Sequence, residues 1–217
     1  MTKQNQQGKI VKSPQSTLVV DGDLPPERLV LETPRLVLRP FTPDDEDIAF
    51  EVLSCPDVMR YVSNAMTAQE VSEHMPDATR RGAGGRIGIW CAQIRETGEK
   101  IGDGVLTPIP IEGEDADWSQ VVPDAYPDDR IEVGYLLKPS AWGKGYATEI
   151  CKRLLQFAFE QTALDEVVAC TDPENSRSQH VLKKSGMRDC GTGRAYGESV
   201  AWFELTRAEW MAQHPAS

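Results

Sequence analysis

One segment in the middle of the chain constrains the fold more than any other. Residues 130–138 have the character of a β-strand, Gly143 and Gly145 follow, and residues 145–161 carry apolar side chains at helical spacing. Glycines let a backbone approach a ligand closely, and the free N–H groups of a first helical turn attract anions. The segment therefore predicts a strand–turn–helix unit that binds a pyrophosphate.

Two common nucleotide-binding motifs do not fit this turn. A P-loop requires G-x-x-x-x-G-K-[ST], which the residues around Gly143 do not supply. A dinucleotide fingerprint requires G-x-G-x-x-G or a final alanine, but Thr148 occupies that last position, and no β-α-β unit lies near the chain start. The turn is therefore predicted to hold a different pyrophosphate compound.

The segments on either side predict the fold class. Strands are expected at 29–31, 35–39, 87–94, 100–106, 167–171, 187–194 and 199–205. Helices are expected at 42–53, 67–81 and 175–185, with a short one after Thr206. The front half is antiparallel and the middle is a β-α-β unit, so we expect an α/β fold with a mixed, mostly antiparallel sheet flanked by helices.

The chain divides into a tail and one domain. Residues 1–26 are polar and predict a mobile tail, and residues 27–217 form a single domain. Residues 108–129 hold four prolines and seven acids, which predicts a long acidic loop. The net charge of −11, with no basic patch evident, disfavours a nucleic-acid partner. It suits cationic partners, although the charge also serves solubility alone.

The cysteines and the hydropathy pattern indicate the cellular compartment of the protein. The five cysteines are widely spaced, odd in number and without a C-x-x-C pair, so we expect free thiols rather than a zinc site or disulfides. No run of eighteen apolar residues and no secretory signal is present, so we expect no membrane span and a cytoplasmic protein. No ligand cluster for a metal is evident.

The glycine turn also carries a family resemblance. Trp142-Gly143-Lys144-Gly145-Tyr146-Ala147 resembles the coenzyme-A signature of the GNAT acetyltransferases, [QR]-x-x-G-x-[GA]. Gly145 and Ala147 match it, and Trp142 replaces the first residue as in the W-G-x-G-Y-A form of the RimJ/RimL-like branch. Residues 175–187 are similar to that branch's N-x-x-S-x-x-x-L-x-K-x-G-F, with Met187 for phenylalanine, and residues 31–39 resemble its first strand. The resemblance covers roughly residues 29–206.

The resemblance implies where acetyl-CoA binds. Strands 131–138 and 165–171 would splay apart in a V, with the pantetheine arm along the main chain of Leu136 and Leu137. The N–H of Leu137 would stabilise the oxyanion. The residues implied to hold the pyrophosphate and its surroundings are Trp142, Gly143, Lys144, Gly145, Tyr146, Ala147 and Thr148.

The resemblance also suggests the catalytic residues, each with a simpler alternative. Asn175 would contact the pantetheine arm, or serve only as a helix N-cap. Ser178 would protonate the leaving thiolate, or be a solvated helix residue. Glu132 is the candidate base, or a strand-edge carboxylate paired with a lysine or arginine. A covalent route through Cys170 stays open, although a buried cysteine is more often inert.

These inferences combine into one predicted function. We expect an acetyl-CoA-dependent N-acetyltransferase that moves an acetyl group to a primary amine by direct attack. The acceptor is a protein N-terminus or a small, possibly cationic amine, and the chain is a monomer or homodimer. The alternatives are a coenzyme-A-binding module without turnover and an interaction subunit whose acidic loop docks a basic partner.

Overall fold

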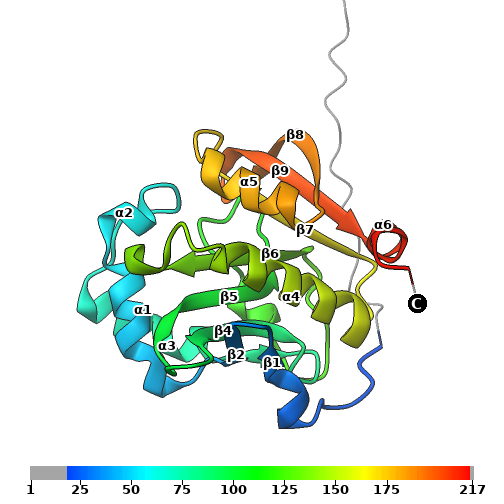
Figure 1. Ribbon diagram of the computed structural model, residues 1–217, viewed down its shortest axis with the longest axis horizontal. Helices are drawn as coiled ribbons and strands as arrows, with labels where there is room; N and C mark the ends of the chain where they lie inside the picture. Colours follow the sequence, from blue (N-terminus) through cyan, green and yellow to red (C-terminus); the bar gives the residue numbers. More distant parts are fainter. Residues whose placement is uncertain (1–18, 216–217) are drawn as a thin grey trace, which may run out of the picture.

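A nine-stranded sheet forms the centre of the computed structural model, which describes residues 19–215 (Figure 1). The strand order is β1-β2-β4-β5-β6-β7-β9-β8, and β3 pairs with β4. The strands are β1 (Leu31–Glu32), β2 (Leu36–Pro40), β3 (Arg81–Gly82), β4 (Ile87–Ile94), β5 (Lys100–Pro108), β6 (Ile131–Leu137), β7 (Glu166–Thr171), β8 (Arg188–Ala195) and β9 (Glu198–Thr206).

The pairing of β6 with β7 differs from every other pairing in this sheet. It is the parallel one, and its register contains the single pair Glu132↔Val168. By contrast, β5 and β6 are matched over seven residue pairs, and β7 and β9 over six. The two middle strands therefore separate after Glu132, and the sheet opens in a V toward the end of β6.

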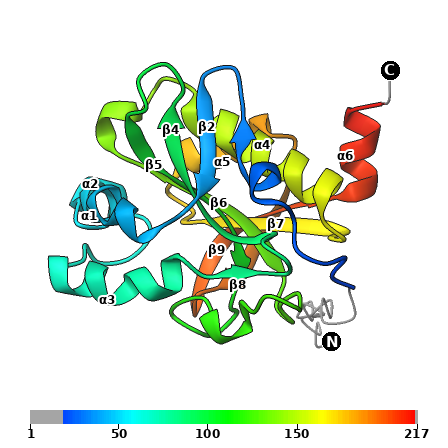
Figure 2. The same ribbon diagram turned by 90° about the horizontal axis from the view of Figure 1, so that it is seen from below.

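Helices cover both faces of the sheet (Figure 2). They are α1 (Glu46–Leu53), α2 (Pro56–Met59), α3 (Ala68–Ala78), α4 (Tyr146–Gln161), α5 (Ser176–Lys184) and α6 (Arg207–Gln213). Figure 2 shows α1 to α3 on one side of β4 and β5, and α4 on the other. A Cβ on Gly104 of β5 would lie 2.5 Å from Ile150 and 2.8 Å from Leu154, so α4 packs against bare backbone there.

The structure confirms the predicted mixed, mostly antiparallel α/β fold with its splay. Thr67 makes a capping box with Glu70, as the sequence predicts, and Thr42, the predicted cap residue of the first helix, makes one with Asp45. The helix expected at 67–81 ends at Ala78, since Arg81 pairs with Gly88 as part of β3. The short helix α2, a single four-residue turn, was not predicted from the sequence.

The acidic segment 108–129 is packed rather than open. Ile109, Val121 and Tyr126 are buried, and the Tyr126 hydroxyl accepts a hydrogen bond from the Ala163 N–H at 3.0 Å. The segment contains a short 3-10 helix, Trp118–Gln120. It therefore folds against the domain, which explains why a stretch of this length is ordered without long helices or strands.

The expected tail falls mostly outside the described residues, which begin at residue 19. Its last part contacts the domain: the Leu24 N–H donates to the Gly84 carbonyl at 2.9 Å, and Arg86 donates to the Gly22 carbonyl. A boundary at residue 26 stays a prediction. Within residues 19–215, no helix is long and apolar enough to cross a membrane.

A buried ion pair fastens α1 to the sheet. The Asp45 side chain is fully buried and accepts two hydrogen bonds from Arg39, at 2.6 and 2.7 Å. The Thr42 N–H and Lys100 also contact this carboxylate. Burial alone would raise the pKa of Asp45, but the bonds from Arg39, Thr42 and Lys100 outweigh it and hold the pKa well below its usual range.

We expect Asp45→Asn to destabilise the fold by about 1.5–3 kcal/mol, because it removes the charge-assisted hydrogen bonds from Arg39 and Lys100, whose side chains are 26% and 23% exposed. The pKa of Asp45 is lowered in the folded state, so its contribution is complete above the unfolded pKa of about 4 and is lost as the pH falls. Urea unfolding between pH 7 and pH 3 measures both effects. Asp47→Asn is the matched control, since Asp47 also contacts Lys100 but is exposed. Equal effects of the two variants would contradict the assignment.

Candidate active site

The glycine turn lies where the sequence predicts it, between the end of β6 and the start of α4. Gly143 and Gly145 have φ angles of 72° and 82°, in the left-handed region that favours glycine. Gly145 is the N-cap of α4, a sixteen-residue helix with no side-chain cap, so its first N–H groups are available to a ligand. The exposed Lys144 adds a positive charge beside them.

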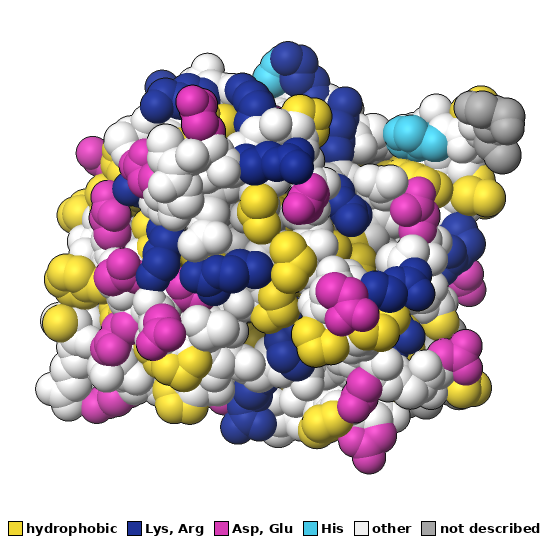
Figure 3. All heavy atoms as spheres, turned by 60° about the horizontal axis from the view of Figure 1, so that its bottom comes forward, with side chains coloured by type: hydrophobic (Ala, Val, Ile, Leu, Met, Phe, Trp, Pro, Cys, Tyr) yellow, Lys and Arg dark blue, Asp and Glu magenta, His cyan; other side chains and the backbone are white. Residues whose placement is uncertain are grey.

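The helix that packs against α4 is more basic than the net charge of the chain suggests. The helix α5 packs against α4 and carries Arg177, His180, Lys183 and Lys184, all exposed. Figure 3 shows several Lys and Arg side chains along the upper part of the view, on a surface that also carries acidic and hydrophobic side chains. Arg177, Lys183 and Lys184 therefore put positive charge on the helix that packs against α4, although the whole chain is acidic.

The opening between β6 and β7 exposes main-chain groups of β6. Lys138 donates to the Ile101 carbonyl and Ile109 donates to the Arg130 carbonyl, which fixes the phase of the β5–β6 ladder. In that phase the N–H groups of Tyr135 and Leu137 turn away from β5 toward the opening. Leu136 faces β5 instead, where its N–H contacts the Asp103 carboxylate at 3.2 Å. Of the two predicted leucines, only Leu137 offers its N–H to the opening.

Trp142 contacts the strand rather than the turn. Its indole N–H donates to the Leu137 carbonyl at 2.6 Å. The ring is 36% exposed, so most of it packs while one edge meets solvent. Trp142 thus fixes the end of β6 relative to the glycine turn, which is a structural reason for tryptophan at this position.

The predicted pair on α5 meets β6 across the opening. Asn175 is the N-cap of α5, and its side chain accepts a hydrogen bond from the Ser178 N–H at 3.1 Å. The Ser178 hydroxyl lies 3.0 Å from the Tyr135 hydroxyl and is partly buried, so it is not a solvated helix residue. Tyr135 is a contact that the sequence analysis did not single out.

Glu132 lies on the other face of the sheet from Ser178. Along β6, Ile131, Val133 and Leu137 join the core under α4, and Glu132 alternates to the opposite side. Its carboxylate is 8% exposed, accepts a hydrogen bond from the Tyr196 hydroxyl, and forms no ion pair with any residue from 19 to 215. The predicted alternative, a pairing with lysine or arginine, is absent from this part of the chain.

The environment of Glu132 favours its protonated form. Burial raises the pKa of Glu132 to about 7, the Tyr196 hydrogen bond opposes this, and the charge of Asp115 adds to it. A carboxyl group with a pKa near 7 is half ionised at neutral pH, which suits a general base. Asp115 belongs to the segment 108–129, so the acidic segment lies beside this carboxylate.

Tyr196 reaches Glu132 from a strained turn. It has a φ of 53°, unusual for a residue with a side chain, in the two-residue turn with Gly197 between β8 and β9. The turn is held by hydrogen bonds from Tyr196 N–H to Pro110 and from Gly197 N–H to Ile111. The segment 108–129 therefore fixes the strained hairpin that positions the tyrosine hydroxyl.

Cys170 is close to Glu132 but poorly suited to attack. Its sulfur lies 4.0 Å from a carboxylate oxygen of Glu132. Burial and the neighbouring Glu132 raise the pKa of the Cys170 thiol above its usual value, which keeps it protonated. The Cys170 thiol therefore lacks the thiolate character that an acetyl-cysteine intermediate requires. All five cysteines are free, and residues 19–215 contain no group of three or more potential metal ligands.

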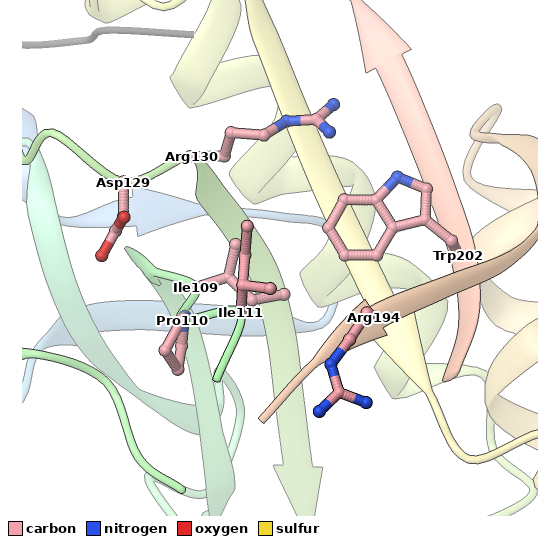
Figure 4. Close-up of a pocket in the computed structure, with 7 residues that line it drawn as sticks. All are labelled: Ile109, Pro110, Ile111, Asp129, Arg130, Arg194 and Trp202. Carbon is pink, nitrogen blue, oxygen red and sulfur yellow. The ribbon is translucent and has the colours of Figure 1, made fainter. Parts of the chain in front are cut away.

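A shallow hollow lies at the opposite end of β6 from the glycine turn. Its lining consists of Ile109, Pro110, Ile111, Asp129, Arg130, Arg194 and Trp202. Figure 4 shows Arg130 and Arg194 extending on opposite sides of Trp202. Arg130 pairs with Glu166 and Glu204, and Arg194 pairs with Glu112. Because these cations are already paired, the hollow does not present free charge to a ligand.

Comparison with known proteins identifies the family. Residues 35–188 match the model of the acetyltransferase (GNAT) domain, which is more than half of the chain. The chain therefore belongs to the GNAT acetyltransferases and is an enzyme of that class.

Individual relatives and solved structures are consistent with this family assignment. The uncharacterized protein YkkB of Bacillus subtilis is 29% identical over 80% of this chain and 94% of its own. The FsC-acetyl coenzyme A-N(2)-transacetylase of Aspergillus fumigatus is 27% identical over 86% and 80%. The structure of the aminoglycoside acetyltransferase AAC(6')-Ib in complex with coenzyme A has a TM-score of 0.61 at 17% identity, over 83% of this chain and 99% of that one. At that identity, the last comparison shows the fold alone.

We expect Glu132→Gln to be more stable than the wild type at alkaline pH. The pKa of Glu132 is raised from 4.5 to about 7 in the folded chain, so the wild type loses stability as the pH rises through this range. The variant should gain about 3 kcal/mol relative to wild type between pH 4.5 and pH 8. Urea unfolding at the two pH values measures this difference. Glu198→Gln, at an exposed position, should show no such gain, and a pH-independent difference for Glu132→Gln would rule out the raised pKa.

Proposed function

We propose that this enzyme transfers an acetyl group from acetyl-CoA to a primary amine by direct attack. The observation that carries the proposal is the position of Glu132: a buried carboxylate without an ionic partner among the described residues, beside the opening of the sheet. A structural carboxylate buried this deeply is normally paired with a cation. An unpaired one with a raised pKa is typical of a catalytic site.

The glycine turn supports acetyl-CoA as the acetyl donor. Its backbone N–H groups and the start of α4 form a site for the pyrophosphate, with Lys144 and the hydroxyl of Thr148 close by in sequence. Two similar proteins support the same donor. One has acetyl coenzyme A in its name, the transacetylase of Aspergillus fumigatus, and the other, AAC(6')-Ib, was solved in complex with coenzyme A. The pantetheine arm fits the opening beside β6, with Asn175 at its far side.

The opening also supplies hydrogen-bond donors for the thioester. The N–H groups of Leu137 and Tyr135 face it, and one such donor stabilises a developing oxyanion by about 3–4 kcal/mol. Ser178, hydrogen-bonded to Tyr135, is the proposed proton donor to the departing thiolate. The Tyr135 hydroxyl is a second proton source on the same face.

The two catalytic side chains act from opposite faces of the sheet. The amine approaches from the face of Glu132, and this carboxylate takes its proton directly or through a water molecule. The thiolate leaves on the face of Ser178 and takes a proton there. The amine nitrogen adds to the thioester carbon to give a tetrahedral oxyanion, and the C–S bond breaks as this intermediate collapses, so one proton is taken from nitrogen on the Glu132 face and one is given to sulfur on the Ser178 face.

The acceptor is proposed to be cationic before it loses its proton. Glu132 and Asp115 create a negative potential where the amine enters, and Glu112 lies on the same segment. Both a protein N-terminus and a small amine fit this requirement. The motif W-G-x-G-Y-A supports placement in the RimJ/RimL-like branch, and the free cysteines support a cytoplasmic location.

Two measurements test this proposal. Acetyl-CoA at about 100 times its dissociation constant should stabilise the fold by about 2.7 kcal/mol, while NADH and ATP should not. Free-thiol release should then appear with members of a panel of amines and N-terminal peptides. Stabilisation without thiol release from any amine would indicate a coenzyme-A-binding module, and the absence of stabilisation would indicate an interaction protein.

Glu132→Gln should lower the turnover by about 100- to 10,000-fold with acetyl-CoA binding unchanged.

We expect Tyr196→Phe to shift the pH profile of kcat/KM to higher pH. The base must be ionised to act, so the acid limb follows the pKa of Glu132, which is about 7. The Tyr196 hydrogen bond lowers that pKa, and its removal therefore raises it. Thiol release measured from pH 5.5 to 9.5 records the limb. The control is Tyr61→Phe, because Tyr61 is distant in sequence and lies on the partly exposed turn after α2. A shift to lower pH in Tyr196→Phe would disprove the role of this hydrogen bond.

A further inference from the structure

Arg35, at the start of β2, contacts the glycine turn from a distant part of the chain. One terminal nitrogen of its guanidinium, Nη1, donates to the Lys144 carbonyl at 2.8 Å. Its Nε and Nη2 pair with Glu149, at 2.7 and 2.6 Å. The guanidinium lies 4.7 Å from the centre of the Tyr146 ring. A single side chain thus touches the middle of the turn and the first turn of α4.

The contact with Lys144 determines where the next N–H points. In a trans peptide the C=O and the following N–H lie on opposite sides of the bond, and all described peptides are trans. Because Arg35 holds the Lys144 carbonyl on its own side, the Gly145 N–H is directed to the other side. That N–H is one of the donors proposed for the pyrophosphate.

Without such a contact this peptide would reorient easily. Lys144 lies between two glycines, both at positive φ, and glycine has low barriers between backbone conformations. Rotation of the 144–145 peptide would present a carbonyl oxygen to the phosphate in place of an N–H. An oxygen repels the anion that the N–H attracts, so the orientation decides whether the turn binds.

Arg35 is itself held firmly. Glu149 accepts hydrogen bonds from the Thr33 hydroxyl at 2.6 Å and from the Arg35 main-chain N–H at 3.0 Å. Its carboxylate therefore joins the β1–β2 connection to α4 at four points. The side chain of Glu149 is only 14% exposed, so solvent weakens this ion pair less than an ordinary surface pair.

We propose that Arg35 is a positioning residue for coenzyme-A binding, which locks the Lys144–Gly145 peptide with its N–H toward the pyrophosphate. The inference rests on the proposed function, since it assigns a role within that cofactor site. It gives a physical role to residues 33–35, which lie far from the reacting atoms.

The test compares a ligand with phosphates to one without them. Arg35→Met should weaken binding of acetyl-CoA by about 10- to 100-fold, the loss typical of a charge-assisted hydrogen bond. Its affinity for S-acetylpantetheine, which lacks the pyrophosphate, should equal that of the wild type. Isothermal titration calorimetry of both ligands measures these values. Arg35→Lys should be intermediate, because an ammonium group cannot hold Glu149 and Lys144 in the same fork geometry.

Arg95→Met is the matched control. Arg95 lies on the same edge of the sheet, is similarly exposed, and pairs with Glu32 rather than with the turn. It should bind both ligands like the wild type. Equal weakening of both ligands by Arg35→Met would show a general disturbance of the fold, and no weakening would show that the peptide needs no lock; either result overturns the inference. Failure of the wild type itself to bind acetyl-CoA would instead contradict the proposed function.

Discussion

The separation of β6 from β7 is the constraint on which the rest of this structure depends. These two strands are held together by one residue pair, and the sheet beyond it is open. The opening leaves main-chain N–H groups of β6 without a partner strand, which are the donors proposed to bind the ligand, and α4 begins just after this end of β6. Packing elsewhere preserves this geometry: α4 rests directly on Gly104, and Trp142 ties the last residue of β6 to the turn.

The local features of the site were predictable from sequence, and the long-range ones were not. The glycine turn and the Asn175–Ser178 cap depend on residues within one or two helical turns, so spacing alone reveals them. Tyr196 lies 64 residues from Glu132, and Arg35 lies 109 residues from Lys144. Neither contact has a local pattern, because each depends on which strands the sheet brings together. Strand β2, for instance, lies three strands from β6 in the sheet order.

The same distinction explains the acidic segment 108–129. Its composition is that of an open loop, and proline and acidic residues dominate it. Composition could not show that Val121 and Tyr126 join the main core while Ile109 joins a second apolar cluster, or that the segment supports the β8–β9 turn. Its hydrogen bonds reach several parts of the domain, and among its charges Asp115 acts on Glu132.

The two halves of the site have different origins along the chain. The proposed donor half comes largely from the continuous stretch between β6 and α5, whereas the proposed acceptor half comes from the segment 108–129 and the β8–β9 hairpin. They share only the strand β6. During evolution the length and the charge of the proposed acceptor segments can therefore change while the proposed donor half is kept intact. On the proposed division of the site, a change of acceptor would leave the stretch from β6 to α5 untouched.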